Sequence, residues 1–63
     1  MQTTFLPYKA AEKKTGLHRT SIHRKVVAGQ FPKPVRLSAR RVAFVESEVE
    51  AWMVAVAAQR DPA

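Results

Sequence analysis

Apolar side chains in the first part of the chain recur at intervals of three and four residues, the spacing of one face of a helix. Tyr8, Ala11 and Thr15 share such a face, which predicts a first helix over residues 7–15. Gly16 follows at once, and glycine adopts at little cost the left-handed conformation that commonly ends a helix. We therefore expect the first helix to end there.

A second helix is predicted over residues 19–28, where Ile22 and Val26 stand one turn apart and Gly29 ends the pattern. The opposite, solvent-facing side of this helix carries Thr20, His23, Arg24 and Val27. Only residues 15–18 separate the two helical patterns, which is the length of turn found in a helix-turn-helix.

The spacing then changes from helical to alternating. Two prolines favour extended chain, and after them Val35 and Leu37 alternate with Arg36, as in a strand with one buried face. A polar, basic turn over residues 38–41 and a second strand over residues 42–45 complete a small β-hairpin.

A third helix is predicted to begin at Ser47, because Ser47 and Glu50 have the spacing of a capping box. Its core-facing residues, spaced at three and four, are Val49, Trp52, Met53 and Val56. The whole order predicts an α+β, mostly helical fold, a small winged helix-turn-helix. We expect one DNA-binding domain over residues 1–60 and a frayed tail over residues 61–63.

Composition narrows the class of protein. A chain of 63 residues has room for one small domain, and without cysteine it can form neither a disulfide nor a thiolate metal site. The longest apolar run, residues 51–58, is far below the roughly 20 residues that span a bilayer, and residues 1–8 lack the pattern of a signal peptide. We therefore expect a cytoplasmic protein without membrane contact, associated with the nucleoid when it binds DNA.

Charge is divided unevenly along the chain. The formal net charge is +6, but residues 1–41 carry +9 and residues 42–63 carry −3. A basic part joined to an acidic part indicates one face for a polyanion and another that avoids it.

The candidate binding residues follow from this order of elements, since a helix fits the DNA major groove and a basic hairpin beside it follows the phosphates. The recognition-helix candidates are Arg19, Thr20, Ser21, His23 and Arg24. The wing candidates are Lys33, Arg36, Ser38, Arg40 and Arg41. The lysines expected to contact phosphates from the first helix are Lys9, Lys13 and Lys14.

Other classes of function fit less well. His18 and His23 lie about 140° apart around a helix, so they cannot share a metal ion, and we expect no metal, no cofactor and no enzyme activity. A protein-interaction module, such as an anti-repressor, would present an acidic or apolar recognition face. An RNA-binding or ribosome-associated protein would expose aromatic rings, whereas Phe5, Tyr8, Phe31, Phe44 and Trp52 all fit core or core-edge positions. Both remain alternatives to DNA binding.

Three segments in this order carry a family resemblance: residues 15–17 (Thr-Gly-Leu), residues 31–35 (Phe-Pro-Lys-Pro-Val) and residues 48–52 (Glu-Val-Glu-Ala-Trp). With them, nearly the whole chain resembles the AlpA family of prophage regulators, which is related to phage excisionases and to the DNA-binding heads of MerR-type regulators. The resemblance implies sequence-specific binding to double-stranded DNA. It also implies a role in integrase activation, in excision of a prophage or island, or in both.

Three positions depart from the family's usual residues. His18 stands where serine usually caps the second helix, His23 stands where an aromatic is common, and Ser38 stands where the hairpin turn often has glycine.

MerR-type regulators dimerise through a long helix that has no counterpart before Ala63. We therefore expect a monomer in solution. The resemblance to excisionases implies cooperative self-association on DNA, for which the third helix offers Ala51, Val54, Ala55 and Ala58.

Overall fold

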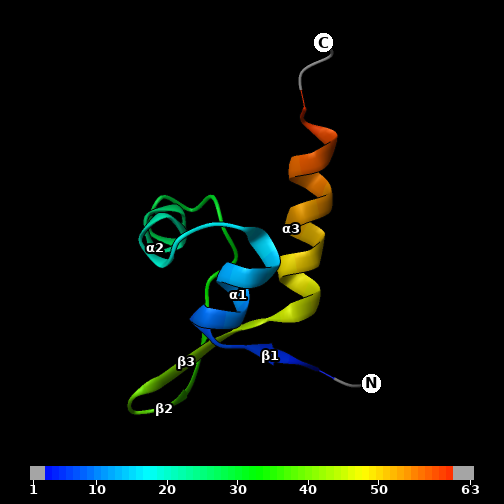
Figure 1. The fold of residues 1–63 in the computed structure, drawn as a ribbon. Coiled ribbons are helices and arrows are strands. Elements are labelled where there is room, and N and C mark those ends of the chain that lie inside the picture. Colours follow the sequence, from blue (N-terminus) through cyan, green and yellow to red (C-terminus); the bar gives the residue numbers. More distant parts are fainter. Residues whose placement is uncertain (1–2, 61–63) are drawn as a thin grey trace.

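Three helices and a three-stranded antiparallel sheet build the fold in the computed structural model, which describes residues 3–60 (Figure 1). In chain order the elements are β1 (Phe5–Leu6), α1 (Tyr8–Thr15), α2 (Arg19–Val27), β2 (Val35–Ser38), β3 (Arg41–Val45) and α3 (Glu46–Ala58). The helix-turn-helix, the β2–β3 hairpin and the C-terminal helix confirm the predicted winged helix-turn-helix. The predicted tail over residues 61–63 lies outside the described residues.

Glycine ends α1 as predicted. Gly16 has a φ of 78°, in the left-handed region, and its N–H donates to the Glu12 carbonyl at 2.8 Å. Thr15 tightens the same turn, since its hydroxyl donates to the Ala11 carbonyl at 2.7 Å and accepts from the Leu17 N–H at 3.3 Å. The chain therefore leaves α1 in a fixed direction and reaches α2 after three residues.

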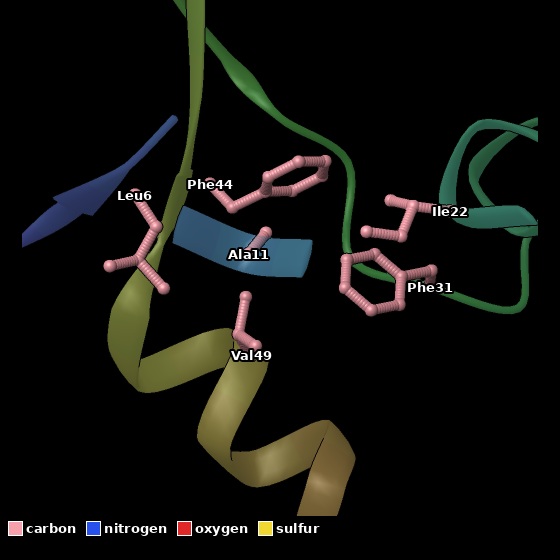
Figure 2. Packing of buried hydrophobic residues seen from close by; sticks show 6 residues of the cluster. All are labelled: Leu6, Ala11, Ile22, Phe31, Phe44 and Val49. Carbon is pink, nitrogen blue, oxygen red and sulfur yellow. The ribbon is translucent and has the colours of Figure 1, made fainter. Parts of the chain in front are cut away.

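Every helix and strand except β2 contributes to one hydrophobic core (Figure 2). The buried cluster is Leu6, Ala11, Ile22, Phe31, Phe44 and Val49. Figure 2 shows these side chains converging from the sheet, the three helices and the segment that follows α2, with Ile22 next to Phe31. Phe44 is central, because its ring meets Tyr8 and Phe31 edge to face at centroid distances of 5.0 and 5.2 Å.

Four of the five aromatic rings lie in or beside this core, as predicted. Phe31 also contacts Trp52, with centroids 4.7 Å apart. Phe5 differs: it remains 42% exposed on β1.

The sheet has one more strand than predicted. Phe5 and Leu6 pair with Val45 and Phe44, so β3 is the central strand of the order β1-β3-β2. Two residues are too short a run to show a strand's alternation, and the Glu46 N–H extends the pairing by donating to the Thr4 carbonyl at 2.8 Å.

The prediction of a buried face on β2 was wrong. Val35 is 40% exposed and Leu37 is 48% exposed, and every residue of β2 is exposed. Figure 1 shows the hairpin extending beyond the helices, so its outer half lies apart from the other elements that the structure describes. The inward-facing residues of the hairpin are on β3, where Ala43 and Phe44 are buried.

The predicted capping box at the third helix was also wrong. The helix begins one residue earlier, at Glu46, with Val45 at the cap position and no side-chain cap hydrogen bond. Glu46 and Glu50 instead lie 3.8 and 3.4 Å from the amino group of Lys14 on α1. These ion pairs use the carboxylates to join two helices.

The core-facing stripe of α3 is shorter than predicted. Val49 is fully buried, and Trp52 and Met53 pack against the core, but Val56 is 43% exposed because α3 has left the rest of the molecule by that turn. The opposite side carries Val54, which is 70% exposed. Within residues 3–60, no helix combines the length and apolar character needed to cross a membrane.

Candidate nucleic-acid interface

The outward face of α2 presents a row of polar and basic side chains. All five recognition-helix candidates are exposed, namely Arg19, Thr20, Ser21, His23 and Arg24. Ile22 anchors the inward face with no exposed surface, and Val26 packs beside it. Burial on one face and exposure on the other allow α2 to contact a partner without loosening the core.

Two side chains hold the start of α2 in place. The Glu12 carboxylate on α1 accepts a hydrogen bond from the Arg19 N–H at 2.7 Å, and His18 Nδ1 accepts one from the Thr20 N–H at 3.2 Å. Both N–H groups lie in the first turn, where a helix has no partners of its own. The imidazole of His18 therefore caps α2 where the AlpA family usually has serine.

Sequence reasoning missed the role of Glu12. The sequence did carry one sign of this role, because Glu12 is the single acidic residue within residues 1–41. Its partner is seven residues away and becomes a neighbour only through the turn at Gly16. The contact ties the start of α2 to α1.

Two hollows flank the exposed face of α2. One, of about 370 Å³, is lined by Tyr8, Arg19, Thr20 and His23. The other, of about 330 Å³, is lined by Ser21, Arg24, Lys25, Ala28 and Gln30. The recognition-helix candidates therefore divide into two groups, and each group lies beside residues that the sequence analysis did not propose as DNA contacts.

The five wing candidates are also exposed, but they do not form one cluster. Arg36 and Ser38 are on β2, Arg40 is in the turn, Arg41 begins β3, and Lys33 precedes the hairpin. A long hydrogen bond of 3.5 Å joins the Arg36 guanidinium to the Ala39 carbonyl, which draws that side chain toward the tip. The tip of the hairpin is thus strongly basic.

The three lysines of α1 have different surroundings. Lys9 and Lys13 are exposed, whereas the Lys14 side chain is 28% exposed and forms the ion pairs with α3. Its charge is offset by Glu46 and Glu50. Lys9 and Lys13 carry the basic charge that α1 presents to solvent.

Acidic and basic groups occupy different parts of the molecule. In residues 3–60 the carboxylates are Glu12 on α1 and Glu46, Glu48 and Glu50 on α3. Neither α2 nor the β2–β3 hairpin contains an acid, and Figure 1 shows both on the left, with α3 on the right. A positive potential therefore covers the side formed by α2 and the hairpin.

The described residues offer little to a metal ion. Across residues 3–60 there is no group of three or more His, Cys, Asp or Glu side chains placed to bind one.

The fold and its basic face define a winged helix-turn-helix protein. Residues 4–56 match the family model described as prophage CP4-57 regulatory protein (AlpA), and the chain belongs to this AlpA family. This confirms the resemblance seen in the sequence.

One curated relative comes from Enterobacteria phage P4. The chain is 45% identical over 38 residues to the uncharacterized protein ORF88, an alignment that spans 60% of this chain and 43% of that protein. The chain thus matches less than half the length of this relative. No solved structure matches the chain.

Proposed function

We propose that the protein binds double-stranded DNA in a sequence-specific way, with α2 in the major groove and the β2–β3 hairpin against the neighbouring backbone. The observation that carries this proposal is the exposed, acid-free face of α2, with its first turn fixed by Glu12 and His18. A pre-set recognition helix loses little freedom when it enters the groove.

We assign the contacts with base edges to the residues at the centre of this face. Arg24 has the fork geometry that pairs with the O6 and N7 atoms of guanine, and Thr20, Ser21 and His23 offer shorter polar groups for base edges. Val27 is 74% exposed on the same helix and supplies an apolar group for a thymine methyl.

We assign the phosphate contacts to the basic groups around these base-reading residues. Arg40 and Arg41 at the hairpin tip, with Lys9 and Lys13 on α1, are exposed cations that can replace condensed counterions. Arg36, Ser38, Lys33 and Arg19 extend the same surface. We assign Lys14 to the contact between α1 and α3 instead, because two carboxylates already surround it.

The biological role that we propose is prophage or island regulation, through integrase activation, through excision as a recombination directionality factor, or through both. Membership of the AlpA family supports this role. We further propose that the protein is a monomer in solution and associates with itself on DNA through Ala51, Val54, Ala55 and Ala58, which are all exposed on α3.

An electrophoretic shift experiment tests the proposal. Duplex DNA from beside the gene should bind more tightly than random duplex, and both should bind more tightly than RNA of the same length. Equal binding to RNA would favour a ribosome-associated protein, and no binding to any nucleic acid would favour a protein-interaction module.

Two variants then separate base reading from positioning. Arg24→Ala should reduce discrimination between the bound and random duplexes by about 1–3 kcal/mol, the size of a bidentate contact to guanine. Arg40→Ala should weaken both duplexes about equally, because phosphates carry no sequence information. If Arg24→Ala and Arg40→Ala changed the affinities for the two duplexes in the same way, these separate roles would be contradicted.

A further inference from the structure

The wing exposes three large apolar side chains among its arginines. Val35 is 40% exposed, Leu37 48% and Val42 37%, although a strand of this kind was expected to bury one face. Three such residues in one short hairpin are more than the single exposed apolar residues that any protein surface carries.

The backbone singles out Leu37 among them. Val35 pairs with Ala43, Arg36 with Val42, and Ser38 with Arg41, so two steps along β2 match one step along β3. Leu37 is the extra residue of this β-bulge and has no partner across the ladder. A bulge bends its strand and turns a side chain out of the regular alternation.

The charge around Leu37 indicates which class of partner this side chain contacts. The hairpin contains Arg36, Arg40 and Arg41 and no acid, and the Arg36 guanidinium donates to the Ala39 carbonyl in the turn that follows β2. A basic protein surface would be repelled by such a rim and a neutral one would gain no charge attraction, whereas a polyanion is attracted to it. An apolar side chain inside a rim of arginines matches the DNA minor groove, where phosphates line both sides and base edges form the floor.

We propose that Leu37 is an apolar wedge that enters the minor groove and partly unstacks one base step, while the neighbouring arginines hold the phosphates on either side. This inference rests on the proposed DNA binding and adds a site that recognises DNA by its deformability. Pyrimidine–purine steps unstack most easily, so the step under the wing should be TA or CA/TG. The protein would then distinguish DNA sequences at this base step without a hydrogen bond to a base.

The test uses the duplex identified by electrophoretic shift, with 2-aminopurine placed in turn at each step of the region that the wing protects. Wild-type protein should raise the fluorescence at one step, because unstacking relieves quenching by neighbouring bases. Leu37→Ala should abolish this rise and weaken binding roughly tenfold, the scale of one buried apolar side chain. Leu37→Met keeps the apolar reach and should retain the rise.

The matched control is Val56→Ala, which removes a similarly exposed apolar side chain (43%) from α3, the helix that Figure 1 shows on the other side from the hairpin. It should leave the fluorescence rise and single-site affinity unchanged. Circular dichroism of each variant checks the fold, which a half-exposed residue such as Leu37 should not determine.

Three results would overturn the wedge. They are a fluorescence rise that persists in Leu37→Ala, tight binding by wild-type protein with no rise at any step, and a dimer in sedimentation that Leu37→Ala dissolves. The second of these leaves the proposed DNA binding intact. Failure to bind any duplex would remove both proposals.

Discussion

Glu12 shows how one side chain can determine the geometry of a motif. Its carboxylate closes the first turn of α2 from the neighbouring helix, at 2.7 Å from the Arg19 N–H. A negative charge at a helix N-terminus also complements the helix dipole, so the carboxylate stabilises α2 both through the hydrogen bond and through its charge. An acid in a basic part of the chain is here a structural residue.

We expect Glu12→Ala to lower the free energy of unfolding by about 1 kcal/mol, as for the loss of a helix cap. In a domain of this size that corresponds to a fall in melting temperature of about 4–8 °C, measurable by circular dichroism. Glu48→Ala is the control, because Glu48 also lies in the first turn of a helix and shares the favourable dipole position, but it is exposed and forms no ion pair among the described residues. An equal effect of the two substitutions would show that Glu12 has no special role.

At the scale of elements, α3 is attached to the rest of the fold by packing, by ion pairs and by a hydrogen bond. Val49 enters the core, Lys14 bridges to Glu46 and Glu50, and the Trp52 indole N–H donates to the Gln30 carbonyl at 2.7 Å. The last contact joins α3 to the segment that follows α2.

Trp52→Phe should keep the ring contact with Phe31 and lose the hydrogen bond to Gln30. The expected loss is about 0.5–1.5 kcal/mol in the free energy of unfolding, the usual net value of one hydrogen bond. Chemical denaturation followed by circular dichroism measures it, with Val54→Ala as the control on the exposed side of α3. A stability equal to wild type would mean that the Gln30 contact contributes nothing.

The elements differ in how far the sequence alone predicts them. The bounds of α1 and α2 follow from local signals, since Gly16 and Gly29 both adopt positive φ and Ile22 is buried as its spacing predicts. Strand β1 has no local signal and exists through pairing with β3.

Tertiary contacts account for the two wrong predictions. Ser47 and Glu50 had the local pattern of a capping box, but Lys14 lies close enough to Glu50 to form an ion pair with it. The outer half of β2 is exposed because no other element reaches it. Among the candidate contacts, exposure could be predicted for every residue except Lys14, whose ion pairs depend on the position of α3. The hollows beside α2 required the placement of Tyr8 and Gln30.

At the scale of the whole molecule, α3 presents apolar residues to solvent, and among its large apolar side chains Val54 is the most exposed, at 70%. A single small domain reads few base pairs, so contact between neighbours on adjacent sites would add both affinity and specificity. The acid-bearing start of α3 also suits approach to the basic side of another copy.

Val54→Glu should therefore reduce cooperative binding to DNA with several sites and leave single-site affinity and the fold unchanged. Binding isotherms on one-site and multi-site duplexes measure this, and sedimentation should show a monomer without DNA. A tight dimer in free solution, or identical wild-type isotherms on the two duplexes, would refute the proposal.

The central claim is that the face formed by α2 and the hairpin neutralises DNA phosphates. Fluorescence anisotropy of a labelled duplex, repeated across a series of salt concentrations, measures this most directly. If about five basic side chains contact phosphates, log K should fall against log salt with a slope of about −4 to −5, and Arg40→Ala should reduce its magnitude by about one. An affinity that barely changes with salt, or a slope that Arg40→Ala leaves unaltered, would contradict the account.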